Sequence, residues 1–113
     1  MYEHPIQDEE TLQKHMEAAD EVRSTDHFEK DVIPDRPSIS KEMVEEYLQR
    51  FDDLLAFTHQ EDTYDEEKYV LIFDKSSTYY LKIVVSFADS CIYLITAHLI
   101  NRNRGDPEDL IER

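Results

Sequence analysis

The sequence is poor in glycine and cysteine, and it contains no tryptophan. Its only glycine is Gly105, so the chain cannot build the glycine-rich loop that holds the phosphates of ATP, nicotinamide or flavin cofactors. Its only cysteine is Cys91, which excludes a disulfide within these 113 residues and a zinc site made of several cysteines. Because Cys91 lies in an apolar run, we expect a buried and unreactive thiol. The sequence predicts no bound cofactor.

Long hydrophobic runs are missing as well. A membrane helix needs roughly 20 uncharged apolar residues, and the nearest candidate, residues 78–100, contains Lys82 and Asp89. Much of this segment alternates between apolar and polar positions, which is typical of a β-hairpin. The N-terminus has neither the basic region nor the apolar core of a signal peptide. We therefore expect a protein of the cytoplasm, prokaryotic or viral, without membrane contact.

Basic residues are few. The chain contains 12 Lys and Arg residues and 27 Asp and Glu residues, which gives a net charge of −15. This balance argues against the broad basic surface that binds nucleic acid. The charge is uneven, because residues 68–104 hold five basic and only two acidic residues. The sequence thus predicts a mildly basic sheet inside an acidic shell. Either a salt-loving source or a binding face for a basic protein would explain the shell.

Hydrophobic periodicity predicts helices in the first half of the chain. Residues 8–22 can form a helix with a thin apolar stripe, which either covers the core at its edge or becomes ordered on a partner. The segment from Ile33 to Pro37 is expected to be extended, because each proline disfavours helical geometry in the residue before it. The clearest helix begins after the N-cap Ser40 and runs to Phe57. An acidic loop is expected over residues 58–67.

The second half of the chain predicts β-structure. Three strands are expected: Tyr69–Phe73, Tyr79–Phe87 and Cys91–Ile100. The last two form a hairpin through a three-residue loop, in a register that places Lys82 opposite Thr96 and Tyr80 opposite His98. This polar set lies on the face away from the helix that follows Ser40. A short C-terminal helix is expected to begin at Pro107.

The expected fold class is α+β, with a three- to four-stranded antiparallel sheet and two or three helices packed on one face. Residues 1–23 are expected to form an N-terminal acidic helix or tail. Residues 24–113 are expected to form a single α+β domain.

The sharpest candidate site is the polar set on the second face of the predicted sheet. It comprises Lys82, Thr96, His98 and Tyr80, and Arg102 and Arg104 follow just beyond the strand. Such a group can bind a phosphodiester, stabilise its added negative charge and supply a general acid or base. Cleavage by a ribose 2′-hydroxyl needs no metal. The alternative interpretation is an ordinary solvated face of a sheet, with Lys82 and Thr96 as surface residues of their strands.

Three further residues have two interpretations each. His27 lies in a short helical or loop segment and is either a surface histidine or a catalytic one. Arg36, between Pro34 and Pro37, is held in a defined direction, for an ion pair with a carboxylate or for a site. His59 lies beside Glu61 and Asp62 in an acidic segment, a weak indication of a metal site, although no histidine pair has the usual ligand spacing.

The order of elements resembles small prokaryotic toxin-like domains, namely the RelE/ParE-type toxins and the barnase–colicin–RelE nuclease fold. The resemblance covers about residues 24–104. It rests on a histidine-bearing helix (His27), the pair Arg36-Pro37, and two strands that read Leu-Lys-Ile-Val-Val and Leu-Ile-Thr-Ala-His, at residues 81–85 and 94–98. It departs from the family in its acidic charge and in His98, where an aromatic residue is expected.

The resemblance implies metal-independent cleavage of RNA through a 2′,3′-cyclic phosphate. It places His27, Arg36, Lys82 and Thr96 at the site, and it implies RNA and a cognate antitoxin as partners. Two alternatives stay open beside an active ribonuclease. One is an inactive relative of such an enzyme, and the other is a non-enzymatic acidic module that binds a basic protein.

Overall fold

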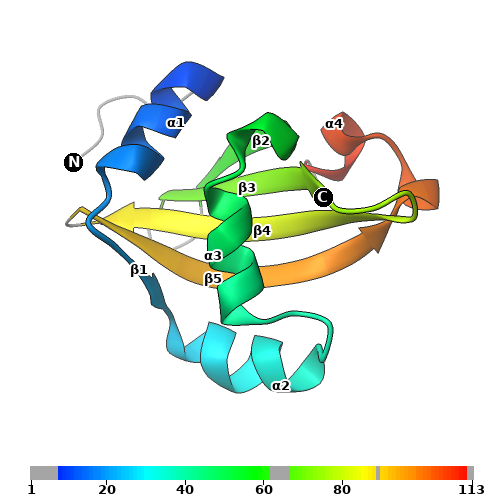
Figure 1. The fold of residues 1–113 in the computed structure, drawn as a ribbon, viewed down its shortest axis with the longest axis horizontal. Helices are drawn as coiled ribbons and strands as arrows, with labels where there is room; N and C mark the ends of the chain where they lie inside the picture. The colour runs from blue at the N-terminus through cyan, green and yellow to red at the C-terminus, as the bar shows by residue number, and fades with distance from the viewer. Residues whose placement is uncertain (1–7, 62–66, 89, 112–113) are drawn as a thin grey trace.

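The computed structural model describes residues 8–61, 67–88 and 90–111. Its centre is a five-stranded mixed sheet in the order β1-β5-β4-β3-β2 (Figure 1). The strands are β1 (Glu21–Ser24), β2 (Leu54–Glu61), β3 (Glu67–Asp74), β4 (Tyr79–Ala88) and β5 (Cys91–Asn101). The pair β1–β5 is parallel, and the other three pairs are antiparallel. The chain is therefore an α+β protein.

The helices are short, and several begin at a side-chain cap. They are α1 (Glu9–Ala18), the π-helix η1 (Phe28–Val32), α2 (Ile33–Asp35), α3 (Lys41–Leu48) and α4 (Pro107–Leu110), with 3₁₀ turns η2 (Phe51–Asp53) and η3 (Arg102–Arg104). Asp8 accepts a hydrogen bond from the backbone N–H of Thr11, and Ser40 accepts one from that of Met43. These bonds satisfy N–H groups that have no partner within the helix. None of the helices in the described ranges is long and apolar enough to cross a membrane.

The main core lies between the helices and one face of the sheet. Helix α3 crosses this face (Figure 1), and its buried side chains Val44, Tyr47 and Leu48 join the apolar residues of β3, β4 and β5. Helix α1 contributes Leu12 and Met16 to the same core. Burial of this apolar surface is the main favourable contribution to folding.

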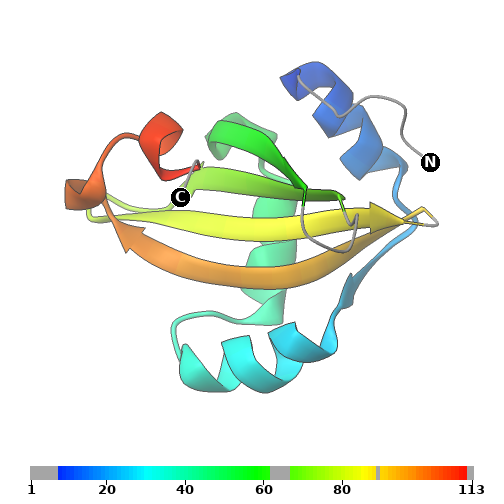
Figure 2. The ribbon, with the colours of Figure 1, turned by 180° about the vertical axis from the view of Figure 1, so that it is seen from behind.

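The second face carries a smaller apolar cluster. Val70, Ile72, Tyr80 and Val84 form it together with Leu110 of α4. Figure 2 shows β4 and β5 in front on this side, with α3 behind the sheet. Because neighbouring residues of a strand point to opposite faces, Lys82 lies on this second face between Tyr80 and Val84. The predicted orientation of Lys82 is thus confirmed, whereas the prediction that all helices pack on one face is wrong for α4.

The predicted sheet was too small. Both β1 and β2 lie in segments for which strands were not expected, and the parallel β1–β5 pair makes the sheet mixed. Helix α3 ends at Leu48, so the expected continuation to Phe57 is wrong. Leu54 to Glu61 instead pairs with β3. Pairing of backbone groups across the sheet outweighed the helix-like spacing of the apolar residues in this segment. Of the expected acidic loop, residues 62–66 lie outside the described residues.

The segment around Pro34 was also wrongly predicted to be extended. Ile33 has helical angles (φ −60°, ψ −50°), and Pro34 lies within α2. The preceding turn buries Phe28 and Val32 in the main core. This burial favours a helical Ile33 despite the local preference of a residue before proline. The chain leaves the helix at Arg36, whose N–H still donates to the carbonyl of Val32 at 3.1 Å.

The β4–β5 register differs from the predicted one by two residues at the polar set. Lys82 pairs with His98, Val84 with Thr96, and Tyr80 with Ile100. At the turn, Ala88 pairs with Cys91, so the hairpin has a two-residue loop where three residues were expected. A β-bulge at Ile95 then shifts the alternation of faces along β5 by one residue. The bulge allows both Leu94 and Ala97 to face the main core, which a regular strand cannot do.

Candidate functional site

The candidate site lies at the middle of the second face. Lys82 of β4 and His98 of β5 are direct cross-strand neighbours. In an antiparallel pair, the β-carbons of such neighbours lie about 4.5–5.5 Å apart. Thr96 lies two residues before His98 in β5, and its side chain is on the same face of the sheet. The register error therefore left Lys82, Thr96 and His98 on one face, because a shift of two residues at these positions does not change the face of a side chain.

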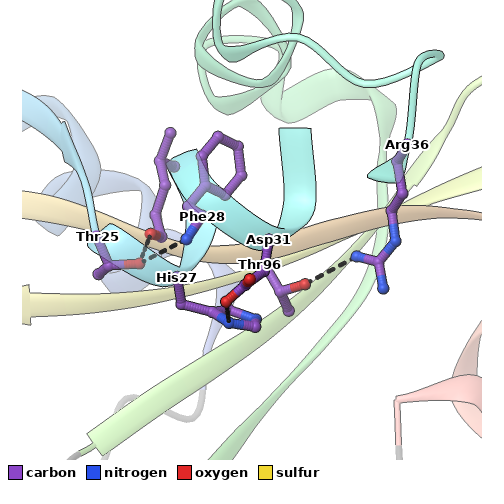
Figure 3. A network of polar contacts seen from close by, with 7 residues as sticks. Thr25, His27, Phe28, Asp31, Arg36 and Thr96 are labelled. Atoms are coloured by element: carbon purple, nitrogen blue, oxygen red, sulfur yellow. Dashed lines mark hydrogen bonds and ion pairs between the residues drawn. The ribbon is translucent and has the colours of Figure 1, made fainter. Parts of the chain in front are cut away.

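Arg36 joins this set from the end of α2. Its Nη1 donates to Thr96 Oγ1 at 3.0 Å (Figure 3). The same nitrogen donates to the carbonyl oxygen of Ala97 at 2.8 Å. Strand β1 ends opposite Leu94, so the edge of β5 beyond that point is open to the guanidinium. Within the described ranges no carboxylate pairs with Arg36. Arg36 therefore contacts β5 rather than forming the ion pair with a carboxylate that was one of its two interpretations.

The positive charges of the site act on its histidine. Burial, together with the nearby charges of Lys82 and Arg36, lowers the pKa of His98 from 6.5 to about 4. Burial likewise lowers the pKa of Lys82. His98 is thus neutral at pH 7. Its Nδ1 is buried and has no hydrogen-bond partner among the described residues, an arrangement that costs free energy unless a ligand or water supplies one.

A cavity of about 480 Å³ opens beside these groups. Lys82, His98, Asn101 and Arg104 supply polar side chains, and Tyr79, Ile100 and Leu110 are among the apolar or aromatic ones. Ligand cavities typically measure about 300–1,000 Å³ and combine an apolar lining with a few polar groups. The cavity lining contains no carboxylate among the residues that the structure describes. The site is therefore suited to an anion with an apolar or aromatic part.

His27 is placed near β5 by its neighbours. The backbone N–H and the hydroxyl of Thr25 both donate to the carbonyl of Leu94, at 3.0 and 2.8 Å, and the N–H of Phe28 donates to the Thr25 hydroxyl. His27 itself is exposed, and its Nδ1 lies 3.1 Å from Asp31 Oδ2 (Figure 3). The side chain of His27 thus contacts Asp31. It is not in contact with the group formed by Arg36, Thr96, Lys82 and His98 among the contacts that the structure describes.

The other members of the predicted polar group, Tyr80, Arg102 and Arg104, were expected to contact the substrate, and they differ in their surroundings. Tyr80 is buried, and the guanidinium of Arg102 lies 4.5 Å from the centre of its ring. Arg102 also donates to the carbonyl of Ser76 at 2.7 Å and forms an ion pair with Asp74. Arg104 is exposed and lines the cavity. Of the three, only Arg104 both faces the cavity and is exposed to solvent.

The weak indication of a metal site gains no support. Across the described ranges, no three His, Cys, Asp or Glu side chains are grouped as metal ligands. His59 lies in β2 with its ring centre 5.1 Å from that of Tyr69. Asp62, its suggested neighbour, lies outside the described residues.

Sequence reasoning missed five residues of the cavity lining, Tyr79, Leu99, Ile100, Asn101 and Leu110. The Asp106-Pro107 pair correctly predicted a helix start, and α4 begins at Pro107. No local signal indicates which face of the sheet a four-residue helix will cover. Leu110 could be assigned to the site only once the packing of α4 was known.

The fold and the site together define an α+β protein with a cationic, histidine-containing cavity on its sheet. No family model, curated protein or solved structure matches the chain.

Proposed function

We propose that this protein is a toxin-like, metal-independent ribonuclease that cleaves RNA through a 2′,3′-cyclic phosphate. The observation that carries the proposal is the grouping of Arg36 and Lys82 near His98, with Lys82 and His98 lining one cavity, in a chain whose net charge is −15. Cationic side chains brought together in this way repel one another, and this cost is recovered when a phosphodiester binds between them.

In this proposal His98 is the general base. Neutral His98 takes the proton of the ribose 2′-hydroxyl, the 2′-oxygen bonds to phosphorus, and the bond to the 5′-oxygen breaks. Lys82 and Arg36 stabilise the phosphorane, and Thr96 orients a phosphate oxygen. The bound phosphate also offsets the charges of Lys82 and Arg36, so the pKa of His98 rises toward the working pH. His27 is the candidate for returning a proton to the leaving 5′-oxygen.

The proposal is tested with a fluorescent oligoribonucleotide and the Lys82→Met variant. Methionine keeps the aliphatic packing and removes the charge. We expect kcat to fall about 100- to 1,000-fold, the usual effect of losing one electrostatic stabiliser. The wild-type product should carry a 2′,3′-cyclic phosphate, a 2′-deoxy substrate should be resistant, and EDTA should have no effect.

The matched control is Lys14→Met, which makes the same change in net charge at an exposed position of α1. It should keep wild-type activity. Unchanged cleavage by Lys82→Met, or dependence on a divalent metal, would contradict the proposal. Binding of RNA by the wild-type protein without cleavage would identify an inactive relative.

The alternative function is a non-enzymatic module that binds a basic protein. Its support is the charge itself, since residues 1–67 hold 21 acidic and 6 basic residues. The test is a salt titration of binding. A complex held mainly by charge weakens steadily as ionic strength rises.

A further inference from the structure

A second concave surface lies on the other side of the molecule, where α1, β1 and α3 meet. This groove has a volume of about 470 Å³. Its floor is apolar and belongs to the main core, with Met16, Leu48 and Ile92 among its residues. In Figure 1, α1 and β1 lie to the left of the sheet, and α3 crosses its middle with its carboxyl end toward α1.

The rim of the groove is acidic. Four carboxylates line it, Glu17, Asp20, Glu21 and Glu45, and the described lining residues include no Lys or Arg. Two of the four have a basic neighbour outside the groove. Glu21 pairs with Arg23, which lowers the pKa of the Glu21 carboxyl. Glu45 Oε1 lies 3.9 Å from Lys41 Nζ. Glu17 and Asp20 have no ion pair within the described part of the chain.

We propose that this groove docks a segment of a basic partner protein in which arginine and leucine side chains lie next to each other. The leucine packs on the apolar floor, and the arginine binds the rim carboxylates, which suit its planar donor group. The volume falls in the range of about 300–1,000 Å³ that is usual for ligand sites. This inference names the surface for the alternative function above, and it holds whether or not the chain cleaves RNA.

Charge argues for this occupant over the two nearest alternatives. A second copy of the chain also carries −15, so two copies repel each other. The remaining segments of the same chain cannot neutralise the rim either. Residues 1–7 and 62–66 contain no Lys or Arg, and residues 112–113 contain one. A separate basic molecule supplies the complementary charge.

The test measures binding of two fluorescein-labelled peptides by anisotropy. The first is Gly-Ser-Arg-Leu-Leu-Arg-Gly-Ser, and the second replaces both leucines with glycine. They have the same charge, so a difference between them reports the apolar floor. We expect the leucine peptide to bind at least about tenfold more tightly, the order of effect of burying one aliphatic side chain.

Charge reversal at adjacent residues of α3 tests the rim. Glu45→Lys should weaken binding of the leucine peptide about tenfold or more, whereas Glu46→Lys, with the same net charge but outside the groove lining, should change it less than about twofold. If Glu45→Lys alters the circular dichroism spectrum, Glu17→Gln compared with Glu46→Gln replaces the pair. RNA cleavage is not measured in this test, so its failure leaves the ribonuclease proposal untouched.

Three outcomes would overturn the proposal. Equal losses in the Glu45 and Glu46 variants would reduce the binding to general charge attraction. Equal affinities for the two peptides would remove the role of the floor. Self-association of the wild-type chain in sedimentation, abolished by Glu45→Lys, would make a second copy the occupant.

Discussion

At the scale of single residues, the unusual group is His98. It is partly buried beside two cations, and its Nδ1 has no partner among the described residues. A histidine held neutral in this way accepts a proton only when a neighbouring anion makes protonation favourable. Its titration is therefore the most direct measure of the local electrostatics.

We expect the His98 ring to titrate near pH 4 in NMR spectra of the wild-type protein. In Lys82→Met the pKa of His98 should rise, because one of the two nearby positive charges has been removed while burial persists. Addition of a 2′-deoxyoligonucleotide, which can bind without being cleaved, should also raise it. A pKa of His98 that is the same in wild type and Lys82→Met would show that Lys82 does not influence the ring.

The same shift has a consequence for stability. The pKa of native His98 lies below the usual value of 6.5, so between pH 6.5 and about 4 the unfolded chain binds a proton that the native protein does not. The contribution that neutral His98 makes to the free energy of unfolding is therefore lost as the pH falls through this window. In urea titrations at pH 7 and pH 4.5, His98→Gln should lose about 1–2 kcal/mol less than wild type, allowing for partial solvent exposure of the ring.

The control for this measurement is His27→Gln, which removes an exposed histidine. It should lose as much stability as wild type over the same pH interval. Equal behaviour of the two variants would assign the acid sensitivity to other groups.

At the scale of elements, the β-bulge at Ile95 determines which side chains of β5 reach the main core. Leu94 and Ala97 are both buried there, whereas Ile95 is half-buried and packs against the smaller cluster on the second face. The hydrophobic pattern of the strand predicts equal burial for Ile95 and Leu81, but the bulge makes them different.

Substitution by aspartate distinguishes these two environments. Leu81→Asp places an unpaired charge in the main core and should lower the free energy of unfolding by about 3–5 kcal/mol. Ile95→Asp should cost less, about 1–2 kcal/mol, because the carboxylate at this half-buried position can reach water. Urea unfolding of both variants measures the difference. A cost for Ile95→Asp as large as that for Leu81→Asp would indicate the regular register without the bulge.

The central strands illustrate what local sequence can predict. β3, β4 and β5 were all expected, because each has a strong run of β-branched and aromatic residues. β2 was missed because Phe51, Leu55 and the residues before them recur at helical spacing. β1 has only four residues and forms a strand by pairing with β5. Short strands of this kind depend on a partner and have little signal of their own.

At the scale of the whole molecule, the dominant fact is the net charge of −15 around a cationic site. In the ribonuclease proposal, the outer charges repel RNA over long distances, whereas Arg36 and Lys82 attract the phosphate at short range. Salt affects the two terms differently, because the Debye length is about 10 Å at 0.1 M salt and long-range repulsion is screened first.

We therefore expect kcat/KM for RNA cleavage to rise with salt, pass through a maximum and then fall as phosphate contacts weaken. Measurements from about 0.02 to 1 M NaCl, with the oligoribonucleotide substrate, test this dependence. A variant with a less acidic surface away from the site, Glu9→Gln with Glu10→Gln, should reach its maximum at lower salt. A steady decline from the lowest salt would mean that the acidic shell does not hinder RNA.

By itself, the sequence determined the α+β class, the three central strands, the N-cap Ser40, the helix start at Pro107, and the face on which Lys82 lies. These features follow from periodicity and capping, which act between residues close together in the chain. Tertiary structure alone decided the contact of Arg36 with Thr96 and the pairing of Lys82 with His98. The first contact joins residues 60 positions apart, and the second depends on a bulge that has no local signal. Both follow from packing across the whole sheet, where the burial of Phe28, Leu94 and Ala97 outweighs local preferences.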